Sequence, residues 1–262
     1  MELISEIKKK KEFKDLNDSF VESALNKIIK ENQLDITKKK NKEEALKKTR
    51  AFLREVYGAF LRKGFDKKEK LLSSLNDLKD YDGHKKILKL HISTAERLPY
   101  YNQVYESIFS ITGKPSSILD IAAGLNPLSY PFMNITPKYY AYELSKKDAE
   151  FLQEYFDKFK IDGKAFSGDI TNEKEMENLP SADVCFLFKA IDTLESIKWN
   201  VTNQLISKLK CKWIVASFPL RSLGHGRMIS EKRLSWFLKL ISKMEYKRIA
   251  IGDEVFFLIR KA

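Results

Sequence analysis

Three acidic residues stand at intervals of 23 and 26 residues and could together bind one ligand. Asp120 ends an apolar run, Glu143 ends a second run that is rich in tyrosine, and Asp169 closes a third. One acid at a strand end often only caps the next helix, but three in successive units are harder to explain in that way. Because ligands of open α/β sheets bind beyond the carboxyl ends of the strands, we expect the three carboxylates to converge there.

The residue types around these acids favour a nucleoside ligand that carries no phosphate. A carboxylate after the second strand can accept both ribose hydroxyls, and one after the third strand can accept a hydrogen bond from the amine of adenine. Ala122 and Gly124, just after the first acid, leave room for a ligand beside the backbone. A dinucleotide would need a G-x-G-x-x-G turn, and Pro127 removes a backbone donor here. We therefore expect S-adenosylmethionine as the cofactor.

An alternating series of strands and helices must position these acids. The apolar runs predict parallel strands at 117–120, 139–143, 164–170, 183–188 and 212–218, helices at 148–159, 191–209 and 234–242, and a closing hairpin of strands 246–251 and 255–259. We therefore predict an α/β fold with the Rossmann-like sheet of class I S-adenosylmethionine-dependent methyltransferases and a terminal antiparallel hairpin. An α-helical N-terminal domain precedes it.

Residues 1–86 predict this separate helical domain, and residues 87–262 the sheet domain. Apolar residues of the first segment recur at helical spacing, which indicates three or four amphipathic helices with basic outer faces. The chain has a net charge of +12, and residues 1–86 contain 23 Lys and Arg against 16 Asp and Glu. A generally lysine-rich surface is the plain alternative, but clustering of the lysines favours a nucleic acid partner. The RNA-binding candidates in these clusters are Lys8, Lys9, Lys10, Lys11, Lys38, Lys39, Lys40 and Lys47.

Other reactive side chains do not suggest a different kind of site. Cys185 and Cys211 each lie in an apolar run, so we expect buried thiols in a reducing cytoplasm. His84, His91 and His225 lack metal-ligand spacing, so we expect no metal. No apolar run reaches the roughly 18 to 20 residues that span a membrane, so we expect no membrane partner.

The stretch from His91 to Leu98 permits two interpretations. Ser93 and Glu96 have the spacing of a capping box and could simply open a helix. Alternatively, Arg97, one turn into that helix, could direct its guanidinium at a ligand carboxylate.

A methyl acceptor that needs no general base suits the residues near the expected pocket. A carbon acceptor would need a cysteine nucleophile, but Cys185 lies inside a predicted strand and Cys211 just before another. An exocyclic adenine amine often goes with an Asn-Pro-Pro-Tyr-like motif, and the run 188–192 reads Phe-Lys-Ala-Ile-Asp instead. Guanine N7 has a free lone pair, so catalysis there reduces to holding the nucleophile and the methyl group in line.

Several motifs together resemble the aminoglycoside-resistance 16S rRNA (guanine-1405-N7) methyltransferases. They are His91-x-Ser93-Thr94-x-Glu96-Arg97-Leu98, Leu119-Asp120-x-Ala122-x-Gly124-Leu125-Asn126-Pro127-Leu128, Lys189 with Leu194-Glu195, and Ser217-Phe218-Pro219-x-x-Ser222-Leu223-Gly224. The resemblance covers residues 85–262 well and the helical N-terminal domain only in outline. It implies that the basic domain docks on the assembled 30S subunit and that the sheet domain methylates a guanine of its decoding site, which blocks some aminoglycosides.

The resemblance also implies roles for individual residues. Arg97 would hold the methionine carboxylate, Glu143 the ribose, and Asp169 with Ile170 the adenine. The full set of cofactor-binding candidates is His91, Ser93, Arg97, Asp120, Ala122, Gly124, Glu143, Asp169, Ile170 and Lys189.

The loop 219–224 would meet the target nucleotide. No residue here can be named as a catalytic group. The candidates for positioning the nucleotide are Phe218, Arg221 and Ser222. Arg221 and Arg227 would bind the flanking RNA backbone. The target guanine must leave its stack, and Phe218 or Trp199 could stack on it. Trp199 is the weaker of the two, because a helical tryptophan more often lies in the core.

The chain departs from the family pattern in places that concern the target more than the cofactor. Ala123 stands where the family commonly has Cys, Ser196 where it often has Gln, and the run 224–227 reads Gly-His-Gly-Arg where a Gly-Gly-Lys-like run is common. Two alternatives therefore stay open: a methyltransferase for another RNA site, such as adenine N1 of 16S rRNA or a tRNA, and a non-catalytic rRNA-binding relative. We expect a monomer.

Overall fold

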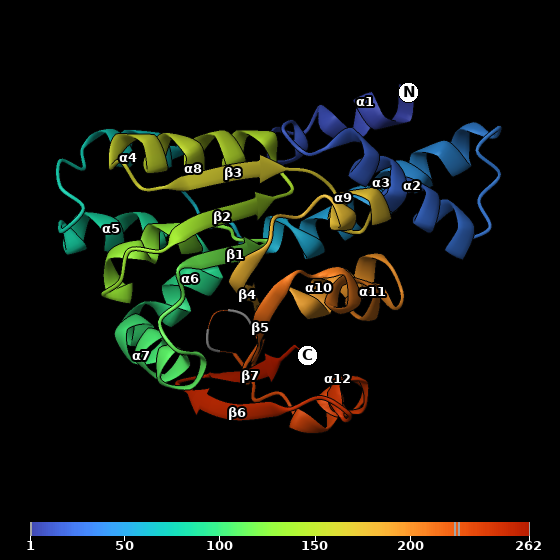
Figure 1. Cartoon of the computed structure of the whole chain (residues 1–262). Coiled ribbons are helices and arrows are strands. Elements are labelled where there is room, and N and C mark those ends of the chain that lie inside the picture. Colours follow the sequence, from blue (N-terminus) through green and yellow to red (C-terminus); the bar gives the residue numbers. More distant parts are fainter. Residues whose placement is uncertain (1, 223, 225, 262) are drawn as a thin grey trace.

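A seven-stranded sheet forms the centre of the molecule (Figure 1). The structure, a computed structural model, describes residues 2–222, 224 and 226–261. The strands are β1 (Ser117–Ile121), β2 (Lys138–Glu143), β3 (Gly163–Ser167), β4 (Ala182–Phe188), β5 (Cys211–Pro219), β6 (Tyr246–Ile251) and β7 (Glu254–Arg260). Their order is β3-β2-β1-β4-β5-β7-β6, and only β7 runs antiparallel to its two neighbours. The predicted α/β fold with a terminal antiparallel hairpin is confirmed.

The strand register brings the ends of β1 to β5 to one edge of the sheet. Ile121 pairs with Tyr142, Glu143 with Ser167, and Phe188 with Ser217. Residues that follow these strands therefore surround a common space, as the sequence predicts.

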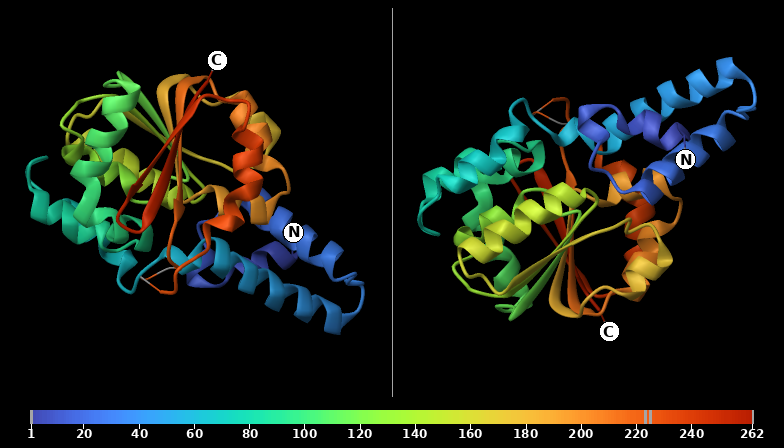
Figure 2. Two further views of the ribbon diagram at one scale, coloured as in Figure 1. Left: turned by 90° about the horizontal axis from the view of Figure 1, so that it is seen from below. Right: turned by 90° about the horizontal axis from the view of Figure 1, so that it is seen from above.

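Two layers of helices cover the sheet (Figure 2). One core contains side chains from α4 (Lys68–Ser73), α5 (Tyr81–Leu88), α7 (Tyr101–Thr112) and α8 (Lys146–Lys158). The other contains side chains from α9 (Glu173–Glu177), α10 (Ile191–Ile197), α11 (Val201–Lys208) and α12 (Ser235–Ile241). β4 lies between them with its last five residues buried, as a central parallel strand requires.

A third core belongs to the N-terminal segment, by which we mean residues 2–60 with α1 (Glu2–Lys8), α2 (Asp18–Glu31), α3 (Lys39–Val56) and the short stretch that follows α3. The α2–α3 hairpin extends away from the sheet (Figure 2). Asn17 starts α2 by accepting the backbone N–H groups of Ser19 and Phe20. α4 and α5 pack instead on the core of the sheet domain. The domain boundary at residue 86 stays a prediction.

Some local expectations are wrong. The helix predicted over 191–209 is two helices, because Asn200 between them takes a left-handed φ of 62°. The capping box does not form: α6 (Ile92–Arg97) starts after His91 with no side-chain cap, and Glu96 bonds elsewhere. The 3-10 helices are η1 (Lys11–Phe13), η2 (Gly58–Phe60), η3 (Phe65–Lys67), η4 (Leu98–Tyr100), η5 (Asn126–Met133) and η6 (Glu231–Leu234).

Among residues 2–222, 224 and 226–261, no helix is long and apolar enough to cross a membrane. The same residues contain no group of three or more His, Cys, Asp or Glu arranged for a metal ion. Both cysteines are free thiols; Cys185 is buried and Cys211 half-buried.

Candidate cofactor and target site

A pocket opens beyond the carboxyl ends of β1 to β4 and encloses about 1050 Å³, its open mouth included. Nine of the ten predicted cofactor residues line it: His91, Ser93, Arg97, Ala122, Gly124, Glu143, Asp169, Ile170 and Lys189. Residues before α4 complete the wall on one side: Phe20, Val56, Tyr57, Phe60, Leu61 and Phe65.

The turn after β1 brings backbone close to the pocket. Ala122 and Gly124 have φ of 54° and 55°, the left-handed region that an alanine enters at a cost of about 1–2 kcal/mol. A Cβ at Gly124 would lie 3.2 Å from the His91 ring, so a larger residue there would push against that ring. The glycine is therefore required both by the turn and by the pocket wall.

Glu143 fixes this turn from the end of β2. Its carboxylate accepts the backbone N–H groups of Gly124 and Leu144. Burial, followed by the charge of Asp148, raises the pKa of Glu143 to about 8. The carboxyl group lies in the wall of the pocket, where a ligand hydroxyl can reach it.

Asp169 follows β3 and lies in the wall beside Ile170. Its Oδ1 accepts the backbone N–H of Thr171 at 2.9 Å and the Thr171 hydroxyl at 2.6 Å. Both bonds end on the same oxygen, so the other can accept from a ligand donor.

Asp120 is the exception among the predicted cofactor residues, because it lies behind the pocket wall. It accepts hydrogen bonds from Asn126 Nδ2 at 2.8 Å and from the Tyr139 hydroxyl at 2.6 Å. Burial raises the pKa of Asp120 to about 6, although these two donors favour the ionised form. Asp120 therefore orients Asn126 rather than a ligand, which corrects the expectation of direct contact.

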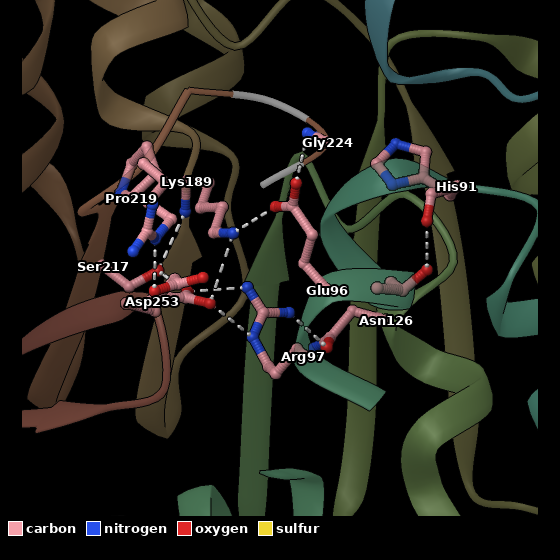
Figure 3. A network of polar contacts seen from close by, with 12 residues as sticks. His91, Glu96, Arg97, Asn126, Lys189, Ser217, Pro219, Gly224 and Asp253 are labelled. Atoms are coloured by element: carbon pink, nitrogen blue, oxygen red, sulfur yellow. Dashed lines mark hydrogen bonds and ion pairs between the residues drawn. The ribbon is translucent and has the colours of Figure 1, made fainter. Parts of the chain in front are cut away.

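Arg97 is held by a carboxylate of the chain itself (Figure 3). Its Nε and Nη2 donate to Glu254 at 3.2 and 2.8 Å, and its Nη1 donates to Asn126 Oδ1 at 3.2 Å. Burial alone would lower the pKa of Arg97, but the charge of Glu254 raises it, so the guanidinium stays charged. These contacts use three of its five N–H donors.

Lys189 joins the same network from the end of β4 (Figure 3). Its ammonium lies 2.7 Å from Glu96 and 3.6 Å from Glu254, and its backbone N–H donates to Ser217 Oγ at 3.0 Å. The Ser217 hydroxyl in turn donates to Glu254. Two cations and two carboxylates therefore balance in a nearly dry space.

Glu96 also connects this network to the loop after β5. Its Oε1 accepts the backbone N–H of Gly224 at 2.7 Å, while Oε2 binds Lys189. Arg221 pairs with Asp253 at 3.1 Å, and the backbone N–H of Ser222 donates to the carbonyl of Arg227.

None of the three predicted loop residues Arg221, Ser222 and Arg227 is among the described residues that line the pocket. Leu223, which belongs to the predicted target loop 219–224, and His225, just after that loop, lie outside the described residues.

The predicted stacking role of Phe218 is wrong. Its side chain is fully buried, with its ring 4.8 Å from that of Phe237 and 6.0 Å from that of Phe257. Phe218 points into the core because β5 alternates its faces, and no base can reach it.

Trp199 has the opposite environment, with 88% of its surface exposed. It stands at the corner between α10 and α11, where Glu195 accepts the backbone N–H groups of Asn200 and Thr202. Lys198 donates to the carbonyl of Thr171, a residue of the pocket wall. The corner therefore presents an indole to solvent beside the pocket.

The predicted RNA-binding lysines of the N-terminal segment divide into two groups. Lys8, Lys9, Lys11 and Lys38 lie within 4 Å of a carboxylate. Lys10, Lys39, Lys40 and Lys47 are exposed, as Lys9, Lys11 and Lys38 of the first group also are.

Several residues of the site are missing from the sequence-based prediction. Glu254 had a detectable signal, because it is an acid that starts an apolar strand in the predicted hairpin. No sequence pattern points to Tyr57, Phe60 or Asp148, because their contacts join segments far apart in the chain.

The fold and the pocket define a class: the Rossmann-like methyltransferases that use S-adenosylmethionine. The solved 16S rRNA methyltransferase RmtF, crystallised with S-adenosyl-L-homocysteine, superimposes with a TM-score of 0.84 over 100% of this chain and 97% of RmtF, at 23% identity. A family model described as "Ribosomal RNA methyltransferase (FmrO)" matches residues 23–235. The chain belongs to this family of ribosomal RNA methyltransferases.

Two curated relatives are similar over most of the chain, and both are named 16S rRNA (guanine(1405)-N(7))-methyltransferase. The Frankia casuarinae protein is 30% identical over 192 residues, which are 69% of this chain and 66% of the relative. The Micromonospora echinospora protein is 26% identical over 230 residues, which are 83% of each.

The residues present fit S-adenosylmethionine, the methyl donor of this class. The left-handed Ala122 and Gly124 leave the backbone open, as a closely bound ligand requires. His91 Nδ1 is buried in the wall region without a hydrogen-bond partner, and Asp169 keeps one oxygen for a donor.

We expect Glu254→Gln to destabilise the fold by about 3–5 kcal/mol, because Arg97 would then remain buried without its balancing charge, while Lys189 would keep only Glu96. Urea denaturation measures this loss. The matched control is Asp162→Asn, whose pair with Lys138 has side chains that are 73% and 44% exposed, and which should cost less than about 1 kcal/mol. Equal losses in the two variants would contradict the assignment.

The same variants give a pH test. Burial alone would raise the pKa of Glu254, but Arg97 and Lys189 lower it from its ordinary value of 4.5. Its stabilisation is therefore present above pH 4.5 and is lost as the pH falls through the lower, folded-state pKa. The loss of stability in acid should be smaller in Glu254→Gln than in the wild-type protein.

Proposed function

We propose that this chain transfers a methyl group from S-adenosylmethionine to N7 of guanine 1405 of 16S rRNA in the 30S subunit, an activity related to aminoglycoside resistance. The observation that carries the proposal is the name shared by its curated relatives, together with the pocket that the family motifs build. The expected cellular site is the cytoplasm, and the expected state is a monomer.

The cofactor supplies an electrophilic methyl group on a sulfonium, and the chain supplies positioning. Glu143 accepts hydrogen bonds from the ribose hydroxyls, and Asp169, beside Ile170, accepts one from the adenine amine. The remaining donors of Arg97 bind the methionine carboxylate, since Glu254 and Asn126 already fix the direction of the guanidinium.

The chemical step needs no base on the enzyme. Guanine N7 carries a free lone pair, so the site has only to align it with the methyl group and exclude water. Lys189 is poorly suited to removing a proton, because its ammonium is held by Glu96 and Glu254. Arg221 and Ser222, in the loop tied to Glu96 through Gly224, hold the nucleotide from the side.

The N-terminal segment supplies the RNA affinity. The exposed Lys10, Lys39, Lys40 and Lys47 neutralise rRNA phosphates. Binding that depends on such contacts weakens steeply as salt is added.

The test of the function is a map of the product. The protein is incubated with labelled S-adenosylmethionine and either intact 30S subunits or naked 16S RNA, and the modified nucleotide is located by mass spectrometry. We expect 7-methylguanosine at position 1405, formed on 30S subunits. A methylated adenine, a methylated tRNA, or cofactor binding with no methyl transfer to any RNA would overturn the proposal.

The pocket acids should separate into two kinds. Asp169→Ala should weaken S-adenosylmethionine binding about tenfold or more, because a hydrogen bond to a charged group is worth about 1.5–3 kcal/mol. Asp120→Asn should mainly lower the free energy of unfolding, because Asp120 lies behind the wall. Calorimetry and urea denaturation of both variants measure this. A larger affinity loss in Asp120→Asn would place that residue in direct contact with the cofactor.

Trp199→Ala should reduce methylation of 30S subunits while cofactor affinity stays unchanged. Loss of one stacked base costs about 1–3 kcal/mol of RNA binding. Trp199→Phe should retain most of the activity because it keeps an aromatic face. Trp236→Ala is the control, since this half-exposed tryptophan packs on Phe237 away from the pocket. Equal rates for both alanine variants would argue against stacking.

A further inference from the structure

Residues 144–148, which are the two loop residues after β2 and the first turn of α8, pack on the N-terminal segment although they belong to the sheet domain. Leu144 packs in the core of α1 to α3. Ser145 forms an isolated antiparallel bridge with Leu16, and the backbone N–H of Lys146 donates to the carbonyl of Asp15 at 3.2 Å. The residue just before this loop is Glu143, the acid proposed to bind ribose.

Asp148, in the first turn of α8, makes the strongest of these contacts. Its Oδ2 accepts the hydroxyl of Tyr57 at 2.6 Å, and its Oδ1 accepts the ammonium of Lys68 at 2.7 Å. The side chains of Asp148 and Lys68 are only 8% and 3% exposed. The Lys68 ammonium also lies 4.2 Å from the centre of the Phe65 ring. One carboxylate therefore binds the residue after α3 and the first residue of α4.

The segment that Asp148 holds is also one wall of the pocket. Tyr57, Phe60 and Phe65 line the pocket, and the Phe60 ring stacks on His91 with centroids 5.7 Å apart and an interplanar angle of 8°. Asp148 itself lies in the same wall. The shape of the cofactor site therefore depends on where the N-terminal segment sits.

We propose that Asp148 is a positioning residue that fixes the N-terminal segment over the cofactor pocket, so that cofactor binding and RNA docking are energetically coupled. The effect on cofactor binding needs only the pocket on this chain. The coupling to RNA rests on the proposed function. By thermodynamic linkage, if RNA docking strengthens cofactor binding through Asp148, cofactor binding strengthens RNA docking by the same factor.

The first arm of the test measures S-adenosylmethionine affinity by calorimetry without RNA. Asp148→Asn should weaken binding about fivefold or more, at the lower end of typical coupling factors. Tyr57→Phe removes one hydroxyl and should weaken binding less. Thermal unfolding and circular dichroism establish that each variant is folded.

The matched control is Asp183→Asn. Asp183 also pairs with a lysine, Lys212 at 2.8 Å, and accepts the backbone N–H groups of Ser116 and Ser117, but it stands near the start of β4, at the opposite edge of the sheet. Its cofactor affinity should equal that of the wild-type protein. If Asp148→Asn and Tyr57→Phe are both folded and both bind as the wild-type protein does, the proposal is overturned.

A pH profile separates positioning from a merely structural role. Burial and Asp148 raise the pKa of Glu143, so wild-type affinity should rise with pH towards 8, as the carboxylate becomes a better acceptor. Asp148→Asn removes a neighbouring negative charge and should move this rise to lower pH. The charged or titratable groups around Glu143 in the pocket region are Tyr57, His91, Arg97, Asp120, Tyr142, Asp148, Asp169 and Lys189. An unshifted profile would count against the proposal.

The last arm adds 30S subunits. In the wild-type protein they should increase cofactor affinity, and in Asp148→Asn this increase should shrink. Equal increases in both proteins would overturn the coupling. If the wild-type protein does not bind 30S subunits at all, the proposed function fails, whereas the effect of Asp148→Asn in the first arm would still support its positioning role.

Discussion

The buried pair of Arg97 and Glu254 is the interaction on which the site depends. It joins α6, which precedes the sheet in sequence, to β7 at the end of the chain, 157 residues later. Lys189 and Ser217 attach the ends of β4 and β5 to the same carboxylate. Charges in such a space are stable only as a balanced set, because each one alone would be costly to remove from water. The set therefore constrains four elements at once, and the pocket is the space that they surround.

Most strand positions could be predicted from the sequence, because a parallel strand covered on both faces needs an unbroken apolar run. The acids Glu143 and Asp169 could be placed because they follow such runs. The pairing of Glu96 could not, since its spacing from Ser93 fits a capping box equally well, and only the arrival of Lys189 decides between the two. Phe218 is predicted ahead of Trp199 as the ring that stacks on the target base, whereas Phe218 is buried and Trp199 is exposed. Strand alternation and a left-handed Asn200 determine where these rings point.

Two buried acids, Glu143 in the pocket wall and Asp120 behind it, make the charge of the pocket region depend on pH. Burial raises the pKa values of Glu143 and Asp120 to about 8 and 6, so the protonated forms persist to higher pH than in water. A ligand that carries a sulfonium and an ammonium favours the ionised carboxylates, and its binding would therefore release protons. For the ligand-free protein the sign is the opposite: the fold holds more protons than the unfolded chain, so these two acids reduce stability as the pH rises through their shifted pKa values.

The N-terminal segment has two faces under different constraints. For the proposed contact with RNA phosphates, its outer lysines need only supply a net positive charge, which many arrangements provide. Its inner face must fit Asp148, His91 and the loop after β2 to within hydrogen-bond distance. Few residues carry the inner contacts, and Tyr57 and Lys68 are recognisable as such only once the fold brings them to Asp148.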